Sequence, residues 1–100
     1  MKRIELAKKI ADKSGITTEA VNLVLTLAIE EIRESVNRGE PVTLRTFGTF
    51  YRHFRPLKVG RNISKNYAIT LPPTFTPKFK PAKTWKQELT KLTNKQIKKF

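Results

Sequence analysis

Residues 18–37 carry more apolar side chains than one face of a helix can hold. One broad stripe at helical spacing consists of Val21, Val24, Leu25, Ala28, Ile29, Ile32 and Val36. Leu23 and Leu27 widen this stripe well beyond an ordinary core face, and charged residues mark a wet side only in the last turns. A helix that is apolar nearly all round must be buried on more than one side. Because a chain of 100 residues has little other cover to offer, the simplest source of that cover is a second copy.

A shorter amphipathic helix is predicted over residues 3–14, just before this one. Its apolar positions are Ile4, Leu6, Ile10 and Ala11. Gly15 suits the left-handed residue that follows a helix, and a threonine at 17 or 18 can cap the next one. Gly39 is expected to end the second helix near Asn37.

From Pro41 onward the apolar period changes from that of a helix to that of a strand. Residues 42–45 alternate as in a half-buried strand, and residues 47–50 are predicted to form a tight turn that leads into a second strand through 55. A third strand is expected around residues 75–79. Pro81 suits the opening of a final helix, and residues 90–100 either extend that helix or fray. Strand alternation predicts a core that contains Phe47, Phe50, Phe75 and Phe79, with Trp85 packed on the sheet.

Positive charge is concentrated in the second half of the chain. Residues 1–50 hold eight Lys or Arg and seven Asp or Glu, a net of +1, whereas residues 51–100 hold thirteen and one, a net of +12; together these make the total of +13. The first half therefore resembles an ordinary scaffold and the second a cationic surface. A polyanion, above all nucleic acid, is the partner that such a surface predicts.

The basic segment 56–68 has too few apolar residues to bury a face. Turn-forming residues lie at its centre, around Gly60. The pattern allows either a disordered loop or the tip of a protruding two-stranded arm. Alternation resumes at Ile69 and is broken by Pro72-Pro73, which strands tolerate mainly at edges and bulges.

The composition argues against an enzyme, a metal site and a membrane protein. The chain has no cysteine and one histidine, His53, so a metal site has almost no ligands, and no nucleophile–base or carboxylate pair suggests itself. No cofactor is expected. No apolar run approaches the length of a membrane span, and the charged N-terminus does not read as a signal peptide. The absence of cysteine also favours, weakly, a cytoplasmic protein.

Over residues 1 to about 90 the sequence resembles the HU/integration-host-factor family. The matching residues are Leu6, Ile10, Gly15-Ile16-Thr17, Gly39-Glu40, Val42, Leu44, Phe47-Gly48-Thr49-Phe50, Arg52, Arg55, Lys58, Gly60-Arg61-Asn62, Ile69, Leu71-Pro72, Pro77, Phe79-Lys80-Pro81 and Lys83. Each motif is weak alone, but their order and spacing together are specific. The sequence departs from the family at Thr46, where glycine is usual, at Ile63, where proline is usual, and at Lys65-Asn66, where Thr-Gly is usual.

The resemblance implies an α+β fold in an intertwined dimer, with a helical base, a short antiparallel sheet and β-ribbon arms that embrace the DNA minor groove. Residues 1–40 would form the dimerisation base, residues 41–81 the sheet and the arm (the arm at about 52–70), and residues 82–100 the last helix and a basic tail, all within one domain. The partner subunit would be identical or a related chain, and the protein would be cytoplasmic and associated with the nucleoid.

The implied function is architectural: the dimer would bend or compact double-stranded DNA. The expected arm contacts are Arg52, Arg55, Lys58, Arg61, Asn62, Ile63 and Lys65. The expected body contacts are Lys2, Arg3, Lys80, Lys83 and Lys86. Ile63 at the arm tip is expected to wedge between base pairs, as apolar residues of minor-groove bending proteins do; the other interpretation is that it packs on its own arm. A structural RNA-binding protein of ribosomal type is the alternative function, and a membrane-surface or polyanion binder that uses the basic tail is a third.

Overall fold

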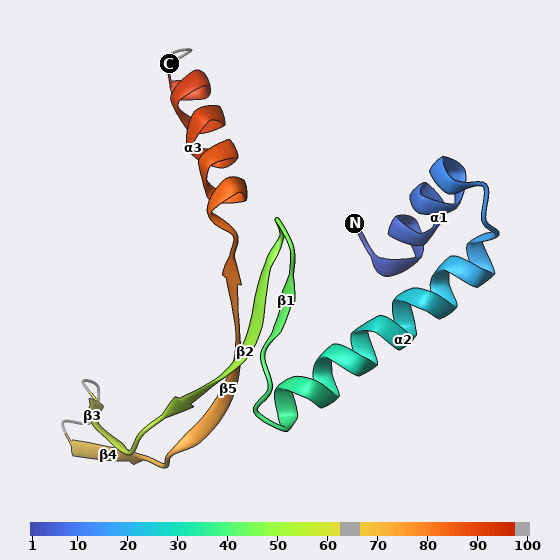
Figure 1. The fold of residues 1–100 in the computed structure, drawn as a ribbon. Coiled ribbons are helices and arrows are strands. Elements are labelled where there is room, and N and C mark those ends of the chain that lie inside the picture. The colour runs from blue at the N-terminus through green and yellow to red at the C-terminus, as the bar shows by residue number, and fades with distance from the viewer. Residues whose placement is uncertain (63–66, 98–100) are drawn as a thin grey trace. The chain divides into compact units, whose positions relative to one another are not determined.

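The computed structural model describes residues 1–62 and 67–97. In chain order its elements are α1 (Arg3–Ser14), α2 (Thr18–Asn37), β1 (Val42–Leu44), β2 (Gly48–Arg55), β3 (Lys58–Asn62), β4 (Tyr67–Leu71), β5 (Thr74–Pro81) and α3 (Lys83–Ile97) (Figure 1). The fold class is α+β, as predicted. The chain divides into two compact units, Met1–Ser35 and Val36–Phe100.

The first unit holds α1 and most of α2, and both helix boundaries at its turn follow from caps. Gly15 adopts a left-handed φ of 77° and donates its N–H to the carbonyl of Ala11 at 3.0 Å. The Oγ1 of Thr17 accepts the N–H of Ala20 at 3.3 Å, so Thr17 caps α2. Both expected boundaries are confirmed.

The core of this unit is small. Ala7, Ala11 and Val21 are buried, and Ile10 and Leu25 pack against them. Much of the other apolar surface of α2 stays in solvent in the single chain, with Leu23, Val24 and Leu27 exposed by 59%, 64% and 51%. Packing α1 on α2 therefore covers one side of α2 and leaves the opposite apolar side open, as its sequence predicts.

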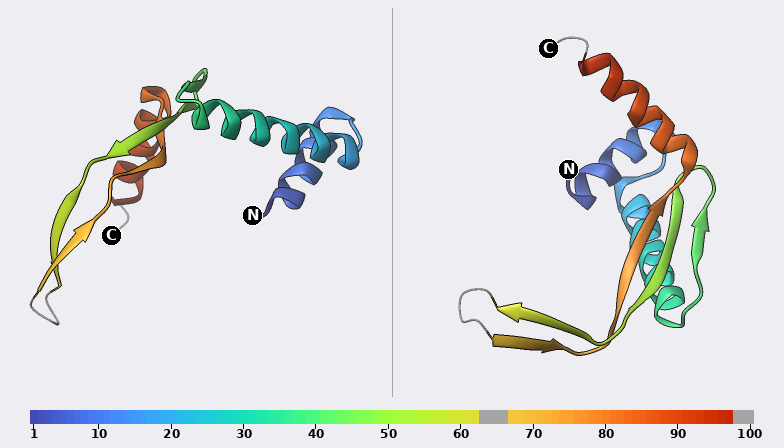
Figure 2. Two further views of the ribbon diagram at one scale, coloured as in Figure 1. Left: turned by 90° about the horizontal axis from the view of Figure 1, so that it is seen from below. Right: turned by 90° about the vertical axis from the view of Figure 1, so that its left-hand side faces the viewer.

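The second unit begins at the end of α2. Gly39, with a φ of 85°, donates its N–H to the carbonyl of Val36 at 2.9 Å and ends the helix. The three-stranded sheet that follows has the order β1-β2-β5 and is antiparallel throughout. The two-stranded ribbon of β3 and β4, called the outer ribbon below, extends away from this sheet (Figure 2). Of the two possibilities for the basic segment, its described residues form the two-stranded arm.

The connection between β1 and β2 differs from the prediction. The turn occupies residues 45–47, and Gly48 already begins β2 and pairs with Leu44 and Pro81. The turn requires a left-handed backbone at Thr46, whose φ is 64°. A β-branched residue is unfavourable there because its side chain crowds the backbone. This explains why glycine is usual at this position in the family that the sequence resembles.

We expect Thr46→Gly to raise the free energy of unfolding by roughly 1 kcal/mol. Left-handed backbone costs an L-residue about 1–2 kcal/mol, and part of that gain is offset because glycine makes the unfolded chain more flexible. Thermal unfolding at fixed protein concentration measures the change. Arg45→Gly is the matched control, since Arg45 lies in the same turn without a positive φ; it should lower the melting temperature. A Thr46→Gly protein that melts below wild type would contradict this account.

An aromatic cluster joins the turn, the sheet and α3. The ring centroids of Phe50 and Phe79 lie 4.7 Å apart, Phe47 lies 5.2 Å from Phe79, and Trp85 stacks on Phe47 at 5.1 Å. Such pairs each contribute about 0.5–1.5 kcal/mol beyond their buried area. Phe75 does not belong to this cluster, contrary to the prediction. It pairs with Phe54 at 5.4 Å, four residues further along the ribbon, and is 55% exposed.

The last helix begins two residues later than predicted. Pro81 is the final residue of β5, and α3 starts at Lys83. Between them, the backbone N–H of Ala82 donates to the carbonyl of Phe47 at 2.9 Å. The helix continues to Ile97, so residues 90–97 extend it rather than fray.

Candidate nucleic-acid interface

Strands β2 and β5 present two chemically different faces, because alternate residues point to opposite sides of a sheet. Their register pairs Phe50 with Phe79 and Tyr51 with Lys78, and it continues unbroken to Arg55 and Thr74. One side, the aromatic face, carries Phe50, Arg52, Phe54, Phe75, Pro77 and Phe79. The other side, the cationic face, carries Thr49, Tyr51, His53, Arg55, Thr74, Thr76, Lys78 and Lys80. Neither strand contains an acidic residue.

Side-chain contacts agree with this division. On the aromatic face the rings of Phe50 and Phe79, and those of Phe54 and Phe75, lie against each other. On the opposite side the hydroxyls of Thr43 and Thr49 approach to 3.1 Å. Arg55, Lys78 and Lys80 are exposed. The cationic face is thus a solvated surface of positive charge and hydroxyl groups, suited to a polyanion.

The predicted arm residues are distributed over β2 and the outer ribbon. Arg55 ends β2, and Lys58 opens β3 opposite Leu71. Arg61 and Asn62 lie in β3, where their backbones pair with Ala68 and Tyr67. The remaining two predicted contacts, Ile63 and Lys65, lie outside the described residues.

Sequence reasoning missed two members of the cationic face, Lys78 and His53. Lys78 pairs with Tyr51, and His53 pairs with Thr76. The signal was present in the alternation of Thr76, Lys78 and Lys80 with the phenylalanines of the same strand. Such alternation identifies residues that share a side, but it does not reveal which strand is the neighbour.

Arg52 lies on the opposite face from Arg55, although both were predicted as arm contacts. Its guanidinium carbon sits 4.0 Å from the centroid of the Phe75 ring. Its Nη1 donates a hydrogen bond to the backbone carbonyl of Asn37 at 3.2 Å. The guanidinium of Arg52 therefore makes these two contacts within the protein.

The strand pairing of the arm is interrupted at one point, where both strands contain proline. Pairing stops after Arg55 and Thr74 and resumes at Lys58 and Leu71. Two residues intervene in each strand, Pro56-Leu57 and Pro72-Pro73, so the ladder keeps its register across the gap. Proline has no backbone N–H to donate. The ribbon changes direction at this point (Figure 1).

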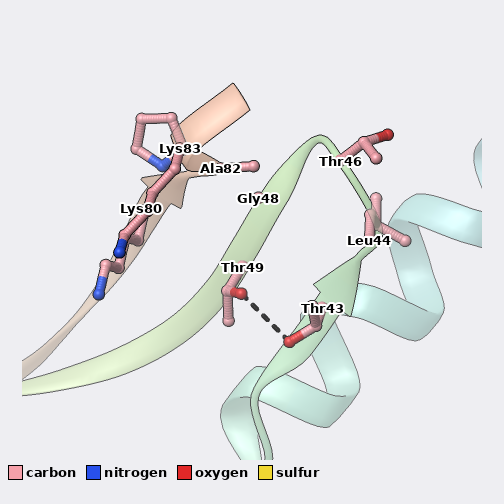
Figure 3. A pocket seen from close by; sticks show the side chains of 9 residues that line it. Thr43, Leu44, Thr46, Gly48, Thr49, Lys80, Ala82 and Lys83 are labelled. Atoms are coloured by element: carbon pink, nitrogen blue, oxygen red, sulfur yellow. Dashed lines mark hydrogen bonds between the residues drawn. The ribbon is translucent and has the colours of Figure 1, made fainter. Parts of the chain in front are cut away.

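Two predicted body residues line the same pocket where β5 leads into α3. Lys80 and Lys83 line a pocket of about 260 Å³ together with Thr43, Thr46, Gly48 and Thr49 (Figure 3). Hydroxyl groups, ammonium groups and the first N–H groups of a helix all favour phosphate. Lys86 lies in the first turn of α3 outside this pocket. Lys2 and Arg3 lie at the start of α1, in the other compact unit.

Two further properties of the described residues bear on function. No helix among them is long and apolar enough to cross a membrane. No group of three His, Cys, Asp or Glu side chains among them is arranged to hold a metal ion.

The chain thus combines a cationic strand face that continues into a two-stranded arm with a helix pair whose apolar side is open, and these are features of a DNA-binding protein. The chain belongs to the bacterial DNA-binding protein family, whose pattern it matches over residues 1–99. It is 36% identical to DNA-binding protein HU of Clostridium pasteurianum over 91 residues, which cover 91% of this chain and all of that one. It is 33% identical to integration host factor subunit beta of Saccharophagus degradans, with 83% and 86% covered. Its structure is similar to HU in the Anabaena HU–DNA cocrystal, with a TM-score of 0.81 and 35% identity over 89% of this chain and 97% of that one.

These relationships confirm the predicted family and support the prediction of a non-enzymatic protein, since the family is one of DNA-binding architectural proteins. They give no support to the ribosomal alternative.

Proposed function

We propose that this protein is an architectural DNA-binding protein that binds the minor groove as a dimer and bends or compacts DNA. The observation that carries the proposal is the cationic face of β2 and β5, which leads without an acidic residue into the outer ribbon. Similarity to an HU chain crystallised with DNA supports the same conclusion. Within the nucleoid, such a protein changes the path of DNA rather than its chemistry.

The proposed contacts divide between the arm and the body. Arg55, Lys58, Arg61, Asn62 and Lys65 of the arm, with Lys78 and Lys80 of the sheet, would neutralise phosphates or line the groove. Lys2, Arg3, Lys83 and Lys86 would hold the flanking DNA. Ile63 would enter the base stack. In minor-groove bending proteins, among them HU and integration host factor, unstacking costs a few kcal/mol per base step, and contacts along the bent duplex offset this cost.

The proposed dimer follows from α2. Its open side exposes the apolar side chains of Leu23, Val24 and Leu27, and a partner with the same helix pair, identical or closely related, would cover them. Residues 1–40 would then be the dimerisation base, residues 41–81 the sheet and arm, and residues 82–100 the last helix and tail of a single domain. The protein would be cytoplasmic and nucleoid-associated.

The experiment that tests this function compares affinity for a nicked duplex with affinity for the same duplex intact, at fixed salt. A nick removes part of the bending cost, so we expect roughly tenfold or greater preference for nicked DNA, equivalent to about 1.4 kcal/mol. Ile63→Ala should reduce this preference. Leu57→Ala is the matched control, because Leu57 is an exposed apolar residue of the arm away from its tip; it should leave the preference unchanged.

Equal affinity of the wild-type protein for both duplexes would refute the proposed bending of DNA. In a competition experiment, double-stranded RNA that displaces the protein from its labelled duplex as effectively as bent DNA does would favour the ribosomal alternative instead.

A further inference from the structure

We propose that Arg52 is a positioning residue that braces the root of the arm, and that it does not act as a phosphate ligand. The arm root comprises residues 52–55 of β2 and residues 74–77 of β5. This inference rests on the proposed function, because it concerns the direction in which the arm leaves the sheet.

One guanidinium joins three elements. Its Nη1 donates to the Asn37 carbonyl at the end of α2, at 3.2 Å. Its carbon lies 4.0 Å from the centroid of the Phe75 ring in β5, and Phe75 in turn packs on Phe54 of β2 at 5.4 Å. Making both contacts with one group favours the planar guanidinium of arginine, which can donate at its edge while its face lies on a ring.

The end of α2 is built to receive this cation. The last carbonyls of a helix lack partners within it, and that end carries partial negative charge. The last turn of α2 contains no basic residue of its own. Gly39, just beyond the helix, leaves room for the side chain: a Cβ at this position would lie 3.0 Å from Nη2 of Arg52. Arg52 of β2, thirteen residues after Gly39 in the chain, brings a positive charge to this end of the helix.

The position of Arg52 at the arm root links it to the orientation of the outer ribbon. Phe54 and Phe75 lie next to Arg55 and Thr74, the last paired residues before the proline break. Beyond that pair the backbone ladder is interrupted, so the orientation of the outer ribbon depends on how firmly the arm root is held. Arg52 ties the root to the end of α2.

The test compares Arg52→Lys and Arg52→Gln with Arg55→Gln in the full-length protein. Energy transfer between dyes at the two ends of a duplex measures bending in saturated complexes, and the slope of log affinity against log salt counts phosphate contacts. Each lost phosphate contact flattens that slope by about 0.9, hence about 1.8 for two subunits. We expect Arg52→Lys and Arg52→Gln to reduce bending alike and to leave the slope unchanged, because lysine keeps the charge but loses the fork. Arg55→Gln should flatten the slope.

Other outcomes separate the possibilities. Wild-type bending by Arg52→Lys together with a flatter slope for Arg52→Gln would make Arg52 a phosphate ligand and overturn the inference. Unchanged bending in both Arg52 variants, with weaker binding only through loss of folded protein, would also overturn it. Absence of bending by the wild-type protein would instead refute the proposed function.

Discussion

Replacing Val24 with aspartate should abolish the dimer and, with it, DNA binding at micromolar concentration. Val24 is 64% exposed in the single chain, on the apolar side of α2 that has no cover within its unit. If a partner covers that side, the substitution buries an unpaired carboxylate in each subunit. An uncompensated buried charge costs several kcal/mol, a large part of the 5–15 kcal/mol that typically holds a protein folded. Sedimentation equilibrium and far-UV circular dichroism would show dissociation and lost helix.

Glu31→Asp is the matched control for this experiment. Glu31 lies on the same helix and is exposed, and the variant carries the same new side chain with the same weak helix propensity. It should remain dimeric. A Val24→Asp protein that is still a dimer with wild-type melting behaviour would mean that this side of α2 stays in solvent, and the proposed dimer would be wrong.

Replacing Gly48 with alanine should lower the free energy of unfolding by about 2–3 kcal/mol, at the upper end of the cost of overpacking. A Cβ at this position would lie 2.6 Å from the carbonyl oxygen of Lys80 and 2.6 Å from two ring atoms of Phe79. Neither neighbour can retreat easily. The first is backbone of a paired strand, and the second is held between Phe47, Phe50 and Trp85.

Chemical denaturation at fixed protein concentration measures this loss, and Thr49→Ala provides the comparison. Thr49 is the next residue of β2 and makes one exposed hydroxyl contact, so its loss should cost well under half as much as Gly48→Ala. Equal effects of the two substitutions would show that the close approach to Phe79 is not what requires glycine here.

Local sequence signals predicted the elements of the fold well where the chain itself supplies the reason. Gly15, Thr17 and Gly39 cap α1 and α2 at the positions expected of them. Alternation located β1 and β2, and the prolines at 56 and 72–73 mark the break in the arm. The errors lie where a distant partner decides. Pro81 has the fixed φ of a helix opening, yet pairing with Gly48 keeps it in β5.

The candidate interface was predictable in its chemistry and less so in its membership. Charge asymmetry indicated a polyanion, and family resemblance indicated an arm. Lys78 was overlooked because its place beside Tyr51 depends on the register of β2 against β5. Arg52 and Arg55 look equivalent in sequence, but their separation by three residues places them on opposite sides of the same strand.

The sequence by itself therefore determined the helices, their caps, the cationic second half and the surplus apolar surface of α2, because periodicity, turn chemistry and net charge are local or additive properties. Tertiary structure alone decided which cations share a surface with Arg55, why Phe75 joins Phe54 rather than the cluster around Phe79, and why Arg52 turns to the end of α2. Those outcomes depend on strand register and on contacts between residues far apart in the chain, which no local pattern encodes.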